Sequence, residues 1–330
     1  MDPWSIELIV TATGRIDDAE RRAVSRDVER GLLHRVRRGV QVDAAEWEGA
    51  TGPDGERARH VVAMRALAEV APRPPVFSHW SAAVLHGLPT VGRRLDRVHV
   101  LVQDDRLRGV QGTCARVLPV QPGEVVRMGG LLATGSARTA IDLADAGPIV
   151  GGIMAADALL AAGLPRALLE QAVDLAGPRK GRRRIDDAVA FAHPGAESAA
   201  ESQNRWSMHL LGLAPQQLQH RVLDRGRLVA VVDTWDEESD VACEVDGDVK
   251  YLDPVMAPAG AGRAVIAEKQ REDLLRSCVA GLARYGYAVA ADPVRLRPVL
   301  ARAGLHPARV RPALADWARE ARAARPRRPR

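Results

Sequence analysis

The stretch VAVVDTWDEESDVACEVDGDVKY, residues 229–251, indicates the fold of the C-terminal part of the chain. Four apolar residues run into Asp233, an acidic turn follows, and the apolar residues VAC lead into Glu244. This pattern predicts two short strands joined in a hairpin. Since side chains alternate along a strand, Glu244 and Asp246 are expected on one face and their sequence neighbours on the other.

The carboxylates of this hairpin predict a metal site. If the two strands pair, Asp233 comes beside Glu244, and carboxylate oxygens gathered in this way, with those of Asp246, are ligands suited to Mg²⁺. Lys250 would supply positive charge. Among 47 basic residues only three are lysines, at positions 180, 250 and 269. Because the chain uses arginine elsewhere, we interpret the last two lysines as chemical rather than incidental.

Length and composition bound the remaining possibilities. A chain of 330 residues allows two or three domains with a core in each. The net charge of +5 and the pI near 9.5 favour a polyanionic partner. Neither a signal peptide nor a membrane span is indicated, so we expect a cytoplasmic protein without a membrane partner. Cysteines 114, 243 and 278 are far apart, which favours free thiols over zinc or disulfides.

Residues 4–45 predict a small helical unit that ends in a hairpin. Apolar residues at positions 4–9 suggest a first helix, and Asp17 or Asp18 can cap a second helix that ends at Gly31. The segment LLHRVRRGVQV then alternates apolar and basic residues, as expected for the two strands of a wing. This is the order of a winged helix-turn-helix.

The basic residues of this unit are candidate DNA contacts. Three arginines of the second helix recur at four-residue spacing and therefore share one face, where they could contact phosphates or bases. The alternative is an amphipathic helix whose arginine face is only solvated, and the residues leave both interpretations open. The candidates on the helix and the hairpin are Arg22, Arg26, Arg30, Arg35, Arg37 and Arg38.

The middle part of the chain, residues 57–165, has the pattern of a mixed α/β unit. Three histidines, His79, His86 and His99, could be considered as a metal set, but no carboxylate or cysteine accompanies them at ligand spacing, which favours packed histidines. Arg138 and Asp142 lie one helical turn apart and predict an ion pair. The expected helices are 57–71, 79–86, 136–146 and 150–162, and the expected strands are 96–102, 114–118 and 124–133.

Four segments share a pattern with a known family: RDVERGLLHRVRRGVQV (26–42), FSHWSAAVLHGLP (77–89), DRVHVLV (96–102) and GGLLATGSARTAIDLAD (129–145). They resemble AbiEi-type antitoxins, the transcription-regulating halves of type IV toxin-antitoxin systems, over most of residues 5–165. One departure is Gln41, where such proteins usually carry a tyrosine. The resemblance implies an N-terminal winged helix that binds DNA, and it leaves a cognate toxin and a homodimer open as partners.

The C-terminal part predicts the order helix, three strands, helix, strand, helix. The basic stretch GPRKGRRR (177–184) before it would favour nucleic-acid phosphates, or it is a solvated connection. We expect helices at 164–176, 185–192 and 198–213, and a strand in QHRVLDRG (219–226) before the hairpin. After the hairpin we expect a helix in AEKQREDLLRSCVAGLARYG (267–286), a strand in YAVAA (287–291) and a last helix.

The segments AESAAES (196–202), VVDTW (231–235), EVDGDVKY (244–251) and EKQRED (268–273) resemble the PD-(D/E)xK nuclease superfamily, and in particular its Vsr-related domains. The resemblance implies a Mg²⁺-dependent phosphodiester cleavage, with Asp233 and Glu244 as ligands and Glu201 positioning a water. Lys250 or Lys269 would orient the nucleophile or neutralise the phosphate. Asp246 stands where the family usually has its lysine, and the strand YAVAADP lacks the arginine and aromatic residue that often follow it in such domains.

The sequence thus predicts an α/β (α+β) protein with two hypotheses for its function. In the first, it is a DNA-binding transcriptional regulator of AbiEi type whose nuclease fold serves as a scaffold. In the second, it is a Mg²⁺-dependent DNA endonuclease targeted by its N-terminal half. The expected parts are a winged helix-turn-helix (1–48), an AbiEi-like domain (57–165), a helical basic linker (166–195), a nuclease-like domain (196–305), and a basic helix and tail (306–330).

Overall fold

A computed structural model of the chain has mixed α and β structure with three β-sheets, as expected for the α+β class. Its internal contacts divide it into two compact units. Unit 1 comprises Met1–Ala155 and Pro165–Ile185, and unit 2 comprises Ala156–Leu164 and Asp186–Arg330. Within the described part of the chain, no helix combines the length and apolar character needed to cross a membrane. The structure describes residues 2–12, 16–91, 95–102, 111–213, 217–246 and 261–306, without the side chains of 122 and 261–268.

Unit 1 begins with a three-stranded antiparallel sheet in the order β1-β3-β2. Its helix α1 is capped by Asp17, whose carboxylate accepts hydrogen bonds from the Ala19 and Glu20 amides at 2.7 and 2.8 Å. Gly31 ends the helix with a φ of 73°. Both predicted helix signals are therefore confirmed. The elements are β1 (Ile9–Val10), α1 (Asp18–Glu29), β2 (Leu33–Arg37) and β3 (Val40–Asp43).

The predicted first helix over residues 4–9 is wrong. Ile9 and Val10 instead form β1, which pairs with β3 in the register Ile9↔Gln41 and Val10↔Val40. The alternation of apolar and polar residues before β1 suits an extended chain, since it turns Ile6 into a buried cluster with Val42. No helix precedes α1 among the residues that the structure describes.

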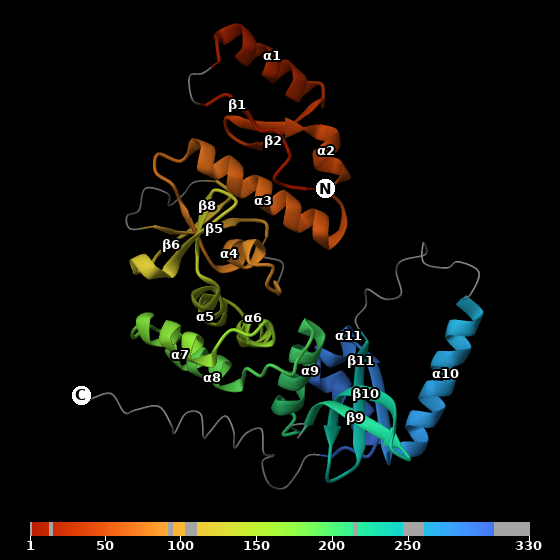
Figure 1. The fold of residues 1–330 in the computed structure, drawn as a ribbon. Coiled ribbons are helices and arrows are strands. Elements are labelled where there is room, and N and C mark those ends of the chain that lie inside the picture. The colour runs from red at the N-terminus through yellow and green to blue at the C-terminus, as the bar shows by residue number, and fades with distance from the viewer. Residues whose placement is uncertain are drawn as a thin grey trace. The chain divides into compact units, whose positions relative to one another are not determined.

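Helix α3 (Gly52–Val70), preceded by α2 (Ala44–Gly49), packs on both sides. Val62 joins the cluster beneath the first sheet, while Met64 and Leu67 belong to a second cluster with Phe77. Figure 1 shows α3 running between the two sheets of unit 1. The helix therefore spreads its apolar residues around its circumference rather than along one stripe.

The second sheet of unit 1 has five strands in the order β6-β5-β4-β8-β7. The predicted strand over 124–133 is in fact a hairpin of two strands, because Gly129 and Gly130 adopt φ values of 53° and 84° at its turn. The other expected elements are found within a few residues of their predicted bounds. Helices α6 and α8 each span the division between the two units. The elements of this part of the chain are β4 (Val76–Phe77), α4 (His79–Leu85), β5 (Val98–Val102), β6 (Thr113–Val117), β7 (Val125–Met128), β8 (Leu131–Thr134), α5 (Ser136–Ala146), α6 (Ile149–Ala161), α7 (Arg166–Leu175) and α8 (Arg182–Phe191).

A network of buried charges holds unit 1 together. The predicted pair is confirmed: Arg138 Nε donates to Asp142 Oδ1 at 3.0 Å, and its Nη1 donates to both oxygens of Glu124 at 2.8 and 2.9 Å. Arg179, from the predicted basic linker, also reaches Asp142 at 3.2 Å and Asp145 at 3.6 Å. This arginine therefore neutralises buried carboxylates and does not offer its charge to nucleic-acid phosphates.

The three histidines of the middle region do not come together as metal ligands. His79 and His99 are buried with ring centroids 6.1 Å apart, whereas His86 Nε2 is bonded to the Thr134 carbonyl at 2.7 Å. Burial and neighbouring arginines lower the pKa of His79 to about 3.

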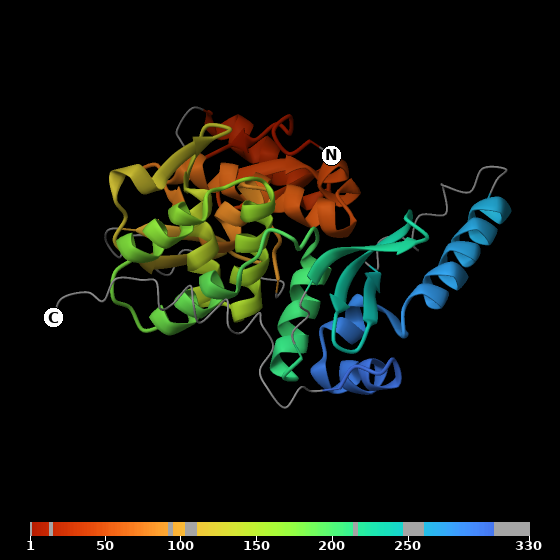
Figure 2. The same ribbon diagram turned by 60° about the horizontal axis from the view of Figure 1, so that its bottom comes forward.

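Unit 2 contains a four-stranded sheet in the order β12-β11-β10-β9. The first three strands in sequence are antiparallel, and β12 returns parallel to β11 after the helix α10. In Figure 2, α9 lies along this sheet and α10 approaches it at its C-terminal end. The elements are α9 (Ala199–Leu210), β9 (Gln217–Asp224), β10 (Arg227–Asp236), β11 (Val241–Asp246), α10 (Ala261–Cys278), β12 (Gly281–Gly286), α11 (Tyr287–Ala290) and α12 (Pro293–Arg302).

Two sequence predictions in this unit are wrong. The segment Gly281–Gly286, expected as the end of a helix, is strand β12, and the expected strand YAVAA contains the short helix α11. Parallel pairing with β11 explains the difference, because it buries Ala283 and Tyr285 in the core beside Cys243. The observed strand carries Arg284 and Tyr285 and ends before YAVAADP.

A buried ion pair joins α9 to the segment Ala156–Leu164 of the same unit. Arg205 Nη1 lies 2.7 Å from Asp157 Oδ2, and both side chains are at most 1% exposed. Ser202 Oγ and the His193 amide also donate to Asp157, each at 2.7 Å. Burial raises the pKa of Asp157, while the charge of Arg205 opposes that shift.

Candidate functional site

The predicted hairpin is present and positions its carboxylates as expected. Strands β10 and β11 pair from Asp236↔Val241 to Thr234↔Cys243, so Asp233 and Glu244 come next in the same register. At that point Asp233 Oδ2 accepts a hydrogen bond from the Val245 amide at 2.6 Å. The Val245 amide of β11 therefore donates to the Asp233 side chain at the point where both strands reach their acidic residues.

Asp233 lies within a concentration of negative charge. Burial, followed by the charges of Glu201, Glu244 and Asp246, raises the pKa of its carboxyl group to about 6, against the opposing effect of the Val245 hydrogen bond. These charges come from α9 and from β11, on the same unit. The other three carboxylates that the sequence singled out thus lie within electrostatic range of Asp233.

Two arginines supply the counter-charge of this cluster. Arg284 on β12 donates from Nε and Nη2 to the two oxygens of Asp246 at 2.8 and 3.1 Å. Parallel pairing places Arg284 opposite Glu244, whose Oε1 also lies 3.4 Å from Arg271 of α10. Sequence reasoning missed both arginines, and it missed Arg284 because GLARYG was expected as the end of a helix.

Of the two predicted lysines, only Lys269 lies among the described residues, and it does not contact the carboxylate cluster. Lys269 is exposed on α10 and makes no hydrogen bond or ion pair with any described residue. Lys250 lies outside the described residues. Its predicted role stays a prediction.

Glu201 is held in a fixed position at the start of α9. Its oxygens accept hydrogen bonds from Ser198 Oγ at 2.8 Å, from the Glu197 amide at 2.9 Å and from Gln219 Nε2 at 2.9 Å. Ser198 accepts in return from the Glu201 amide, which completes a reciprocal cap of the helix. This carboxylate therefore stabilises α9 as well as contributing charge to Asp233.

The hydrogen bonds of the carboxylate oxygens reduce the number of candidate metal ligands that the sequence predicted. Within the described ranges, no three His, Cys, Asp or Glu side chains are arranged to hold a metal ion. Both oxygens of Asp246 are engaged by Arg284, which disfavours Asp246 as a ligand. Asp233 Oδ1 accepts no hydrogen bond from a described residue, and the contacts of Glu244 are long, at 3.4 and 3.8 Å. Asp233 and Glu244 are thus the carboxylates of this cluster that remain candidate metal ligands.

A second candidate site is a basic groove between α1 and the β2–β3 hairpin, with a volume of about 260 Å³. Arg21 and Ser25 of α1 face Arg35 and Arg38 of the hairpin across it, together with the Gln41 amide. No carboxylate is among the described residues that line it. We call this site the α1–hairpin groove. The sequence predicted Arg35 and Arg38, but it missed Arg21 and Ser25, because the helix face turned to the hairpin is fixed by packing.

The other predicted DNA contacts lie elsewhere. Three of them are exposed on α1 but do not line the α1–hairpin groove, and the fourth is half-buried and lines another cavity. None of the four forms a hydrogen bond or ion pair through its side chain with a described residue. They are Arg22 and Arg26 on α1, Arg30 at its C-terminal cap, and Arg37 on β2.

Fold and sites together define a two-unit α+β protein with a basic groove in one unit and an arginine-neutralised carboxylate cluster in the other. Comparisons of the chain with family models, with curated proteins and with solved structures found no match. The AbiEi and Vsr resemblances therefore stay predictions, and the function is argued from the two sites.

Proposed function

We propose that the chain is a DNA-binding transcriptional regulator of the AbiEi antitoxin type, in which α1 and the β2–β3 hairpin act as a winged helix. The α1–hairpin groove carries this proposal. Three arginines converge in it with a serine hydroxyl and a glutamine amide, and these are the groups that hold DNA phosphates. A cognate toxin and a second copy of the chain belong to this proposal as partners.

The arrangement of charge supports a phosphate-binding role. Arg35 and Arg38 make no ion pair with described residues, so their charges are available to a polyanion. Arg21 is paired with Asp18 only through a surface contact of 3.4 Å, with side chains 50% and 82% exposed. Such exposed pairs are weak and are readily exchanged for a phosphate. Arg22, Arg26 and Arg30 extend the basic surface along the outer face of α1.

Fluorescence anisotropy with a labelled DNA duplex, over a series of salt concentrations, tests this proposal. The double substitution Arg35→Gln with Arg38→Gln should lower affinity and reduce the slope of log K against log salt by about 2, or about 1 per lost phosphate contact. Arg295→Gln with Arg297→Gln removes the same charge from α12 and should leave the slope unchanged. Equal losses of DNA affinity in the two double variants would contradict a role of the α1–hairpin groove in DNA binding.

A Mg²⁺-dependent DNA endonuclease is the second candidate, and the raised pKa of Asp233 favours it. A dense group of carboxylates raises the free energy of the ionised site, and a divalent cation would relieve that repulsion. Asp233 and Glu244 would hold the ion. When bound, it would supply positive charge to the phosphate and an activated water. Arg271 and Arg284 could hold the phosphate of the substrate.

Nicking of supercoiled plasmid in the presence of Mg²⁺ tests this candidate. Asp233→Asn and Glu244→Gln preserve side-chain shape and should each abolish nicking, whereas Glu237→Gln in the exposed turn should not. Residual activity that is equal in the wild type and all three variants would end the nuclease candidate. It would leave the DNA-binding proposal standing.

A further inference from the structure

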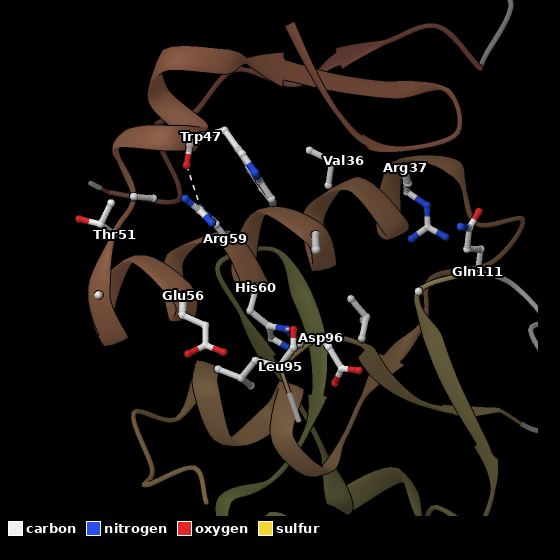
Figure 3. Close-up of a pocket in the computed structure, with 15 residues that line it drawn as sticks. Val36, Arg37, Trp47, Thr51, Glu56, Arg59, His60, Leu95, Asp96 and Gln111 are labelled. Carbon is white, nitrogen blue, oxygen red and sulfur yellow. Dashed lines mark hydrogen bonds between the residues drawn. The ribbon is translucent and has the colours of Figure 1, made fainter. Parts of the chain in front are cut away.

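A second cavity of unit 1, which we call the hairpin-base cavity, has a volume of about 790 Å³ and opens between β2, the α2–α3 region and the start of β5 (Figure 3). This volume is within the range of small-molecule sites. Its apolar wall includes Val36, Trp47, Ala63 and Val98. This cavity is separate from the α1–hairpin groove: Arg37 lines the hairpin-base cavity, whereas its neighbour Arg38 lines the groove.

Arg37 is the basic group of this cavity for which no partner is found among the described residues. Its guanidinium extends toward Gln111 in Figure 3 and makes no hydrogen bond or ion pair with any residue that the structure describes. Burial lowers the pKa of Arg37 from its ordinary value, although the group stays charged at neutral pH. No carboxylate of the described residues forms an ion pair with this half-buried cation, and an anion in the cavity would offset the cost of burying it.

The other basic groups of the cavity are already engaged. Arg59 donates to the Trp47 carbonyl at 2.9 Å and lies over the Trp47 ring, 5.3 Å from its centroid. His60 is bonded through both ring nitrogens, to the Leu95 carbonyl at 2.9 Å and to Ser81 Oγ at 2.8 Å. Burial lowers the pKa of His60 to about 4, so its ring is neutral at physiological pH. Arg37 is thus the cation left to meet a ligand among the described lining residues.

The acids at the rim narrow the class of anion. Glu56 and Asp96 are exposed lining residues, and Figure 3 shows their carboxylates on the side of the cavity formed by α3 and the β5 entry. Two rim carboxylates repel a ligand with several negative charges, such as a polyphosphate or a DNA strand. A ligand with one negative charge and an apolar body avoids most of this repulsion.

We propose that the hairpin-base cavity binds a small organic monoanion, with its acidic group at Arg37 and Gln111 and its apolar body against Trp47 and Val98. The site is distinct from the α1–hairpin groove and from the carboxylate cluster of unit 2. It does not depend on the protein binding DNA. Its chemistry is that of an aromatic or aliphatic carboxylate or sulfonate.

Two probes that differ in charge test this assignment on the full chain. 1-Anilinonaphthalene-8-sulfonate is an aromatic monoanion, and N-phenyl-1-naphthylamine is its uncharged relative. Fluorescence titration should give saturable binding of both probes. Arg37→Gln should weaken the affinity for the sulfonate probe by about tenfold or more, which is the effect expected from losing a charge-assisted contact. It should change the affinity for the uncharged amine by less than about twofold.

Two further variants control the location. Arg38→Gln removes the same charge from the next residue of the hairpin, outside this cavity, and should leave both probes unchanged. Ala63→Phe fills the apolar part and should weaken both, with near-ultraviolet circular dichroism to check the fold. The assignment is overturned if the wild type binds neither probe saturably. It is also overturned if a folded Arg37→Gln variant binds the sulfonate as the wild type does.

Discussion

Replacing Asp233 by Asn should stabilise unit 2 at neutral pH. The asparagine Oδ1 can still accept the Val245 amide hydrogen bond, so the change removes charge and keeps the contact. Burial and the charges of Glu201, Glu244 and Asp246 raise the pKa of Asp233 from 3.8 to about 6. The ionised carboxylate is therefore destabilising in the folded protein, as expected where function rather than stability selects a residue.

The size and pH range of the effect follow from the two pKa values. The pKa of Asp233 is higher in the folded protein than in the unfolded chain. The contribution of the protonated carboxyl group to the free energy of unfolding is therefore complete below pH 3.8 and is lost as pH rises through about 6. A shift of about two units corresponds to about 3 kcal/mol at most. We expect Asp233→Asn to raise the free energy of unfolding of unit 2 by about that amount near pH 7.5, and by about half as much near pH 5.

Pulsed hydrogen–deuterium exchange along a urea gradient, in buffer with a chelator, measures this quantity. Mass spectrometry of peptides from β10 and β11 reports the unfolding of this unit separately from that of unit 1. Glu237→Gln removes a charge from the exposed turn of the same hairpin and should have no comparable effect. A gain from Asp233→Asn that does not depend on pH, or no gain, would refute the electrostatic account.

Three further predictions concern stability. Unit 1 should lose stability as pH falls from 6.5 toward 4, because burial lowers the folded pKa of His60 to about 4 and that of His79 to about 3. This pH dependence has the opposite sign to that of Asp233. Pulsed exchange of peptides from α3 and α4 measures the stability of unit 1, and a value that is constant over this pH range contradicts the prediction. Asp157→Ala should cost about 3–5 kcal/mol in urea unfolding of unit 2, because it leaves Arg205 buried and uncompensated; a loss below about 1 kcal/mol would mean that the pair is not buried. Gly281→Ala should cost about 1–3 kcal/mol, because an added Cβ would overlap the Ala303 carbonyl, whereas Gly49→Ala has open space and should be nearly neutral by thermal unfolding.

Much of the fold follows from local sequence signals. The helix start at Asp17, the stop at Gly31 and the strands around the DEESD turn depend on capping, on turn chemistry and on alternation, which act over a few residues. Where such signals were ambiguous, prediction failed. The short segments GLARYG and YAVAA suit helix or strand almost equally, and burial beside Cys243 made the first a strand.

The candidate DNA contacts illustrate a different limit. In a regular strand Arg35 and Arg37 would share one face, but the register of β2 against β3 shifts between them. Arg35 therefore lines the α1–hairpin groove, and Arg37 lines the hairpin-base cavity. A bulge of this kind has no strong signal in the residues themselves.

The sequence by itself determined the acidic hairpin, since alternation and an acidic turn suffice to set Asp233 opposite Glu244. Only the tertiary structure decided which cations meet those carboxylates. Arg284 reaches them because β12 pairs in parallel with β11 across a long connection, and Arg271 does so because α10 packs against the same sheet. Pairings between residues far apart in the chain are set by the packing of whole elements, which local sequence patterns do not encode.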